Sequence, residues 1–180
     1  AFISTPKVTP GAATVKALVE IENSSAESSP LTLRLKVTGP GSSPGGKADL
    51  KGSVPAGGKK TFSIPVKVSS PRLWSPDSPV RYTAELEVVA GTKIVDRVTI
   101  PFGIRTFETD PDKGLLLNGQ EIKLKGGCVH HDHGPLGAAA LGRAEERRVE
   151  LLKLAGYNAI RTSHNPPSKE FLSACDRIGM

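Results

Sequence analysis

The first 105 residues alternate apolar and polar side chains in short runs, as strands do when one face lies on a core and the other faces water. In the run L-T-L-R-L-K-V, which begins at Leu31, every second residue is apolar. Such runs, separated by Gly, Pro and Ser, predict strands at 2–7, 14–21, 31–37, 48–53, 61–68, 82–89 and 93–100. This spacing of short strands is typical of an immunoglobulin-like sandwich.

Proline and glycine add detail to this prediction. Pro65 lies inside its run and has no amide hydrogen to donate, so its strand should lie at a sheet edge or carry a bulge. The stretch 38–46 (T-G-P-G-S-S-P-G-G) predicts turns. The Pro-rich stretch 71–79 contains the only Trp of the chain, Trp74. We interpret Trp74 as an aromatic plug at one end of the sandwich or, alternatively, as a platform against a neighbouring domain.

Beyond Phe102 the pattern changes. Asn118 and Gly119 stand between short apolar runs and predict a hairpin, because both accept the positive φ angles of a type I′ turn. The pattern then predicts a strand, a helix, a second strand and a second helix at 123–129, 143–155, 158–161 and 168–178. Gly156 is a natural left-handed stop for the first helix. This order is how a parallel α/β fold begins.

Composition and charge argue against several classes of partner. Residues 1–105 carry the whole net charge of +6, and their Lys residues are scattered over alternating strands, so we expect no nucleic-acid partner. No apolar run reaches the ~18 residues of a membrane span and no signal-peptide pattern occurs, so we expect no membrane partner. Cys128 and Cys175 fit no ligand spacing, and we interpret both as small buried hydrophobes.

The polar residues that follow the two strands of the second region are the candidates for chemistry. The stretch 128–134 (C-V-H-H-D-H-G) holds three of the four histidines, and the fourth, His164, follows the next strand. Loops that follow parallel strands converge on one face, which is where barrel active sites lie. We therefore expect one cluster that contains His130, His131, Asp132, His133, Arg161 and His164.

Three interpretations of this cluster remain open. His-x-His can chelate a transition metal, although no second ligand pair at zinc-site spacing accompanies it. Imidazole and guanidinium groups can instead bind a polyhydroxylated or anionic ligand, since an imidazole offers one donor and one acceptor to a pair of sugar hydroxyls. His131 and His133 can also be solvated or packing residues of the loop. His130 and His164 stand beside the carboxyl ends of strands, which favours a function for them.

Arg161 ends an otherwise apolar strand, so we expect it to be buried. A buried guanidinium is costly unless a carboxylate pairs with it. Asp132 is the candidate partner within the chain, and a carboxylate from a later strand is the alternative. Glu170 and Asp176 lie on the last predicted helix, and we interpret them as surface charges.

The stretch 158–180 (N-A-I-R-T-S-H-N-P-P-S-K-E-F-L-S-A-C-D-R-I-G-M) resembles the signature of glycoside hydrolase family 2, the β-galactosidase and β-glucuronidase group. Upstream, F-G-I-R-T-F-E, L-N-G-Q-E-I-K-L-K-G-G and H-H-D-H-G-P-L-G support the resemblance. It is strong over 98–180 and mainly architectural over 1–97. The chain departs from the family at Asn165, where an aromatic residue is common, and at Cys128, where Asn is frequent.

The resemblance implies a multi-domain fold in which an all-β immunoglobulin-like sandwich (1–105) precedes the first β/α units of a (β/α)8 TIM barrel (106–180). That barrel would be incomplete. It also implies a retaining exo-glycosidase acting on terminal β-linked sugars, with a nucleophile and an acid/base glutamate on later barrel strands. We therefore expect the chain alone to be inactive.

The resemblance also assigns roles to residues of this chain. His130 and His164 match positions that hydrogen-bond sugar hydroxyls, and Arg161 matches one that orients the nucleophile carboxylate. Asp132 and His131 are further candidates for substrate binding. We expect a carbohydrate substrate and no resident cofactor or metal in the chain, although a divalent cation in the full enzyme is compatible with the resemblance.

Two β/α units cannot close a barrel, so we expect their apolar faces to be exposed or covered in a homo-oligomer. We also expect association, disorder or low stability after about residue 110, and a periplasmic or secreted location in preference to a cytoplasmic one.

Two alternative functions belong to other functional classes. One is a non-catalytic carbohydrate-binding or adhesion module built on the sandwich, and the other is a metal-dependent hydrolase that uses H-H-D-H.

Overall fold

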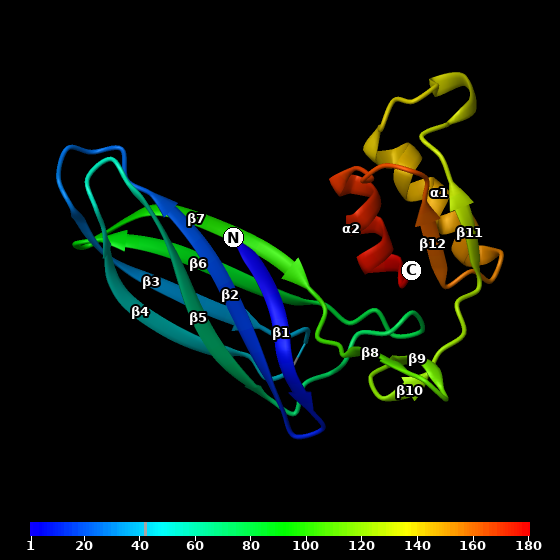
Figure 1. Ribbon diagram of the computed structural model, residues 1–180, viewed down its shortest axis with the longest axis horizontal. Helices are drawn as coiled ribbons and strands as arrows, with labels where there is room; N and C mark the ends of the chain where they lie inside the picture. The colour runs from blue at the N-terminus through cyan, green and yellow to red at the C-terminus, as the bar shows by residue number, and fades with distance from the viewer. Residues whose placement is uncertain (42) are drawn as a thin grey trace. The chain divides into compact units, whose positions relative to one another are not determined.

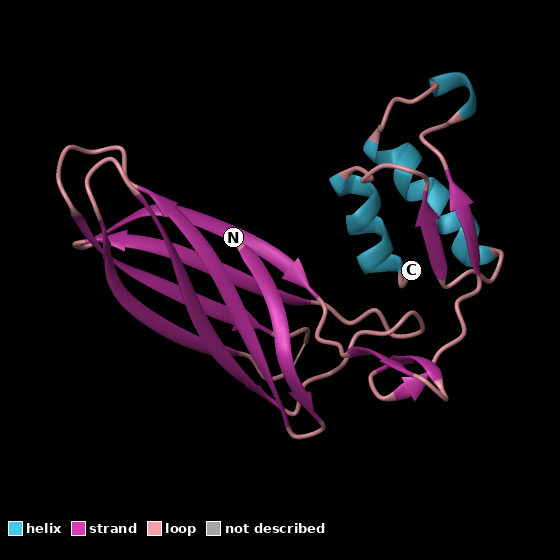
Figure 2. Ribbon diagram, in the orientation of Figure 1, coloured by secondary structure: helices cyan, strands magenta, loops and turns pink. Residues whose placement is uncertain are grey.

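The computed structural model describes residues 1–41 and 43–180 and divides the chain into two compact units. The first unit comprises Ala1–Arg72 and Arg81–Thr106, and the second comprises Leu73–Val80 and Phe107–Met180. The first unit is built from strands, whereas both α-helices belong to the second (Figure 1 and Figure 2).

The first unit is a two-sheet sandwich, as the sequence predicts. Its described strands are β1 (Phe2–Thr9), β2 (Ala12–Glu22), β3 (Ser29–Thr38), β4 (Gly46–Val54), β5 (Lys59–Ser69), β6 (Tyr82–Ala90) and β7 (Lys93–Phe102). They form one sheet in the order β1-β2-β5 and another in the order β4-β3-β6-β7. Each predicted strand is present with ends that agree to within two residues. The turn expected at 38–46 joins β3 to β4, and its Ser42 lies outside the described residues.

Alternating burial along the strands explains why the sandwich forms. In β3 the apolar positions from Leu31 to Val37 are buried, and the intervening polar residues are exposed or half-buried. Burying one such aliphatic side chain contributes roughly 1.5–3 kcal/mol. Pro65 lies in β5, which is an edge strand, as the missing amide donor requires.

The second unit opens with a small antiparallel sheet. It consists of β8 (Phe107–Asp110), β9 (Gly114–Leu117) and β10 (Gln120–Glu121). The predicted hairpin is confirmed, since Asn118 and Gly119 have φ angles of 54° and 77°. The pattern did not indicate β8, because its four residues F-E-T-D carry no regular apolar alternation.

Two β/α units follow this sheet. They consist of β11 (Gly126–Val129), a 3-10 turn η1 (Gly134–Leu136), α1 (Gly142–Leu154), β12 (Ala159–Thr162) and α2 (Lys169–Ile178). β11 and β12 pair in parallel, as predicted. β11 is shorter than the strand expected at 123–129. The Asn158 side chain accepts a hydrogen bond from Lys125 N and donates one to Lys123 O, which occupies backbone groups that a strand ladder would use.

The two helices share a small core with the parallel strands. Val149 of α1 and Phe171 of α2 are buried, and Val129 and Ile160 of the two strands pack against them. Ser168 begins α2 as its N-cap, and the Ser168 hydroxyl accepts a hydrogen bond from Phe171 N at 3.1 Å. The strands and helices predicted from the sequence therefore pack around one apolar cluster.

The interpretation of Trp74 as a plug of the sandwich is wrong. Trp74 belongs to the second unit, is 4% exposed, and its indole Nε1 donates to Asp176 O at 2.8 Å. Asn118 Nδ2 in turn donates to Trp74 O at 3.0 Å. An indole N–H needs an acceptor when it is buried, and the last turn of α2 supplies one.

The same segment makes further polar contacts within the second unit. Lys153 Nζ donates to Pro76 O at 2.8 Å and to Gly179 O at 2.7 Å. Gly179 has a φ of 86°, and a Cβ added there would meet Pro76 O. Residues 73–80 thus bind where α1 and α2 end, although the chain places them between two strands of the sandwich.

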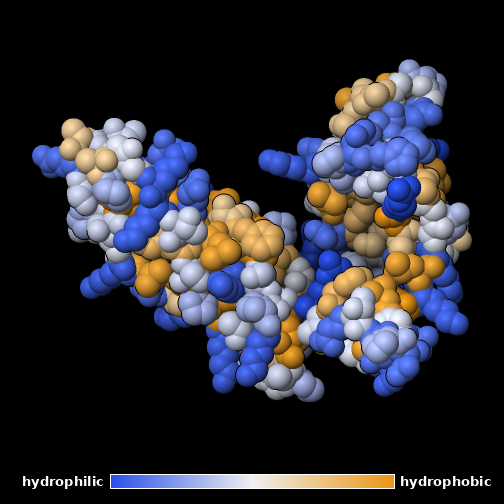
Figure 3. All heavy atoms as spheres, viewed as in Figure 1, coloured by the Kyte–Doolittle hydropathy of each residue, from blue (hydrophilic) through white to orange (hydrophobic). Residues whose placement is uncertain are grey.

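Several large apolar side chains of the second unit are exposed in this chain, and whether a second copy covers them stays a prediction. They are Phe107, Leu124, Leu136, Leu141, Leu151, Leu154 and Leu172, and Leu154 is 84% exposed. Figure 3 shows hydrophobic residues reaching the surface in both units. No helix in the described part of the chain combines the length and the apolar character that crossing a bilayer requires.

We predict that Trp74→Phe lowers the free energy of unfolding of the second unit by about 1–2 kcal/mol, because the aromatic ring stays but the indole donor is lost. Denaturant unfolding followed by the far-UV circular dichroism of the helices measures this loss. Tyr82→Phe is the control, since it removes a hydrogen bond to Arg72 N within the first unit. A helix transition that moves equally in both variants would contradict the assignment of Trp74.

Candidate functional site

The parallel pairing of β11 with β12 brings two imidazoles together. Cys128 pairs with Arg161 and Val129 pairs with Thr162, so His130 and His164 follow strands that end side by side. The two imidazole centroids lie 5.9 Å apart, and the rings meet edge to face at 83°. The expectation that these residues are neighbours despite their separation in sequence is confirmed.

Arg161 lies in the same group, but its surroundings differ from those predicted. Its side chain is exposed, and its Nη1 donates to Ser163 Oγ at 3.0 Å and to Cys128 Sγ at 3.4 Å. The expectation of burial is wrong, and of the two candidate partners left open, Asp132 does not pair with Arg161 among the described residues. The register explains the difference, because it puts Cys128 directly beside Arg161 on the neighbouring strand.

The two cysteines have opposite environments. Cys128 is exposed, and the Ser163 hydroxyl and the Arg161 guanidinium beside it lower the pKa of its thiol. Cys175 is half-buried on α2, and burial raises the pKa of its thiol to about 12. The interpretation as a buried hydrophobe is therefore wrong for Cys128, whose thiol belongs to the polar group around Arg161.

Of the remaining loop residues, two are exposed to solvent and one packs against α1. His131 and Asp132 are exposed, and Asp132 Oδ1 accepts a hydrogen bond from Gly134 N at 3.1 Å. The His133 side chain is buried, with its Nε2 atom 3.3 Å from Glu145 Oε1. The expected cluster therefore separates: His133 faces the helix, whereas His130 packs against His164.

H-H-D-H does not gather as a metal-ligand set. No group of three His, Cys, Asp or Glu side chains within residues 1–41 and 43–180 lies close enough to hold a metal ion. His130 instead packs against His164, whereas His133 lies beside Glu145.

Two charged residues of α1 that the sequence analysis did not select hold this loop. Arg148 Nη1 donates to His130 O at 2.8 Å, and Arg148 Nη2 donates to Asp132 O. Glu145 is 3% exposed. Helical spacing could have indicated both residues, because Glu145 lies four residues before Val149 and Arg148 lies four residues before Leu152. Residues four apart share one face of a helix, so both charged side chains lie on the face that carries the apolar residues.

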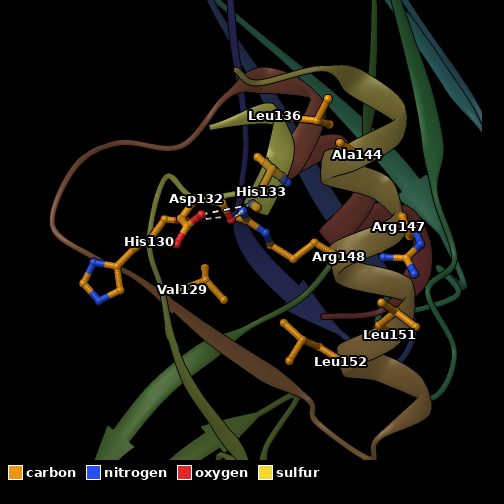
Figure 4. A pocket seen from close by; sticks show the side chains of 11 residues that line it. Val129, His130, Asp132, His133, Leu136, Ala144, Arg147, Arg148, Leu151 and Leu152 are labelled. Carbon is orange, nitrogen blue, oxygen red and sulfur yellow. Dashed lines mark hydrogen bonds between the residues drawn. The ribbon is translucent and has the colours of Figure 1, made fainter. Parts of the chain in front are cut away.

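A groove of about 650 Å³ lies between this loop and α1. Its lining residues are Val129, His130, Asp132, His133, Gly134, Leu136, Ala144, Arg147, Arg148, Leu151 and Leu152. Figure 4 shows the His130 ring projecting away from α1 and the Arg148 side chain extending from α1 toward the loop. His130 lines this groove and also packs against His164, so the groove and the imidazole pair share a residue.

Comparison with known proteins gives consistent matches over both units. A family model described as "Glycosyl hydrolases family 2" matches residues 1–105, and one described as "Glycosyl hydrolases family 2, TIM barrel domain" matches residues 110–180. A β-galactosidase of Bacteroides ovatus is 47% identical over 128 residues, which is 71% of this chain. A β-glucuronidase of Bacteroides fragilis is 36% identical over 118 residues, which is 65% of this chain.

Solved structures agree with these matches. A glycosyl hydrolase family 2 member from Bacteroides cellulosilyticus superposes with a TM-score of 0.94 at 38% identity, over 99% of this chain and 25% of that one. A Bacteroides uniformis β-glucuronidase superposes with a TM-score of 0.90 at 32% identity, over 99% of this chain and 22% of that one. The chain spans only 15% and 17% of the length of the two curated relatives.

We predict that iodoacetamide alkylates Cys128 much faster than Cys175 in the folded chain at neutral pH. A lowered pKa increases the reactive thiolate fraction of an exposed thiol, by about tenfold for each pKa unit. Peptide mass spectrometry after timed alkylation measures both rates in one sample. Arg161→Gln should slow the reaction of Cys128 and leave that of Cys175 unchanged. Equal rates for the two thiols in the folded protein would contradict the prediction.

Proposed function

The chain belongs to glycoside hydrolase family 2, and on that basis we propose that it is part of a retaining exo-glycosidase that removes terminal β-linked sugars. The relatives named β-galactosidase and β-glucuronidase support galactose or glucuronic acid as the sugar class. The proposed domain division is a sandwich over 1–105 and the start of the catalytic barrel over 106–180.

One observation carries this proposal most directly: the imidazoles of His130 and His164 meet at the carboxyl ends of two paired parallel strands. That edge is where barrel enzymes assemble their active sites. Two imidazoles at a centroid separation of 5.9 Å can offer donors and acceptors to neighbouring hydroxyls of a single sugar ring. The arrangement suits a polyhydroxylated ligand.

Arg161 would complete the part of the site that this chain contributes, by binding the nucleophile carboxylate. Both of its described side-chain bonds start from Nη1, and the guanidinium is exposed. Its Nη2 and Nε hydrogens therefore remain free to pair with a carboxylate in the fork geometry that arginine favours. Ser163 and Cys128 contact Nη1, and the Nε–Nη2 edge would bind the nucleophile carboxylate.

The chemical step would belong to residues outside these two β/α units. A retaining glycosidase needs two carboxyl groups about 5–5.5 Å apart, one as nucleophile and one as acid/base. The resemblance assigns both to glutamates on later barrel strands. The role of this chain's residues is then to bind the sugar hydroxyls and to orient the nucleophile, with Asp132 and His131 as further candidates for sugar contact.

We predict that the 180-residue chain does not hydrolyse p-nitrophenyl β-galactoside, β-glucuronide or β-mannoside, whereas the full-length protein that contains it hydrolyses at least one. Release of p-nitrophenol measures both activities. Turnover by the chain alone at enzymatic rates would place the catalytic carboxylates within these residues. Absence of turnover by the full-length protein on every β-glycoside tried would refute the glycosidase assignment.

In the full-length protein, His130→Ala or His164→Ala should lower kcat/KM by roughly 100-fold, because each removes a group that binds the sugar in the transition state. Lys169→Ala is the control, since Lys169 is exposed at the start of α2 and should leave kcat/KM unchanged. Steady-state kinetics on the best chromogenic substrate decides the matter. Unaltered kcat/KM in both histidine variants would show that the imidazole pair does not bind the sugar.

A further inference from the structure

We propose that Arg148 and Glu145 of α1 act as a clamp that positions His130, so that sugar binding depends on a charged pair that does not touch the sugar. This inference rests on the proposed role of His130 in sugar binding. It adds two positioning residues on a helix whose side chains the family signature does not include.

The first support is the geometry of Arg148. Its Nη1 donates to His130 O at 2.8 Å, and its Nη2 donates to Asp132 O. A planar guanidinium fork can reach two carbonyls of one loop at the same time, which a single ammonium group matches less well. One of these carbonyls belongs to the residue that carries the functional imidazole, so the position of Arg148 sets the backbone from which that ring projects.

The second support is the environment of Glu145. The residue is 3% exposed, and its Oε2 lies 3.8 Å from Arg148 Nη1. Oε2 accepts no hydrogen bond from the described residues, so the carboxylate acts on Arg148 through charge. Its Oε1 lies 3.3 Å from His133 Nε2 in the same loop. A buried carboxylate is tolerated when a cation pairs with it, and here it keeps the Arg148 guanidinium oriented toward the loop.

The third support is that the loop has few other anchors. Asp132 N donates to His130 O, and Gly134 N donates to Asp132 Oδ1, but both bonds lie within the loop. Ser163 N donates to Val129 O, which fixes the end of β11 but not the next residue. Within the described residues, the hydrogen bonds that join 130–132 to α1 both come from Arg148.

Arg147 provides a matched control on the same helix. It is the preceding residue, carries the same charge and is exposed, whereas the Arg148 side chain is 14% exposed. Arg147→Met and Arg148→Met therefore make the same chemical change one position apart. A difference between them reports on the loop contacts and not on the net charge or helix propensity of α1.

The decisive experiment is a double-mutant cycle on kcat/KM in the full-length protein. Arg148→Met alone should lower kcat/KM about 10- to 100-fold, because a displaced binding group loses most of its effect. Added to His130→Ala, the same substitution should cause little further loss, since residues that act as a unit are not additive. Arg147→Met should leave kcat/KM unchanged. Independent, multiplicative losses in the Arg148 and His130 variants would overturn the clamp.

A second readout in the 180-residue chain does not need activity. Cross-ring nuclear Overhauser effects between His130 and His164 should be present in the wild-type chain and in Arg147→Met, and lost in Arg148→Met. Arg148→Lys, which keeps the charge but not the fork, should weaken them and covers the case in which Arg148→Met fails to fold. Retention of these effects in folded Arg148 variants would refute the clamp. An inactive full-length wild type would refute the proposed function alone.

Discussion

The parallel pairing of β11 with β12 is the constraint on which the candidate site depends. It aligns Cys128 with Arg161 and brings the two strand ends together, so that His130 and His164 meet although a helix separates them in the sequence. A shift of the register by one residue would turn Arg161 to the opposite face of the sheet and remove its bond to Cys128. The polar group is thus a consequence of backbone pairing and is not set by any local motif.

The surrounding elements stabilise that pairing in two different ways. Apolar contacts from Val149 and Phe171 hold the helices on the sheet, and these follow directly from the amphipathic pattern of the helices. Charged groups of α1 then fix the loop that follows β11. Arg148 and Glu145 occupy the same stripe as Val149, so one face of a single helix supplies both the packing and the polar anchor.

Residues 73–80 show that sequence order and structural units need not coincide. They interrupt the strands of the sandwich, yet Trp74 donates to the last turn of α2, and Pro76 accepts a hydrogen bond from Lys153 of α1. Prolines exclude this segment from a sheet, which leaves its carbonyls free to accept bonds from other elements. An aromatic residue in a Pro-rich connector therefore indicates burial but not the unit in which it is buried.

The sequence by itself determined the strands of the sandwich, the edge position of β5, the Asn118-Gly119 hairpin and the strand–helix order, because period and turn chemistry are local properties. It also placed His130, Arg161 and His164 at one edge, since parallel strands share a direction. Only the tertiary structure decided the partners of Arg161, the exposure of Cys128 and the unit of Trp74. Those depend on register and on which distant groups approach, and no single stretch of sequence encodes either.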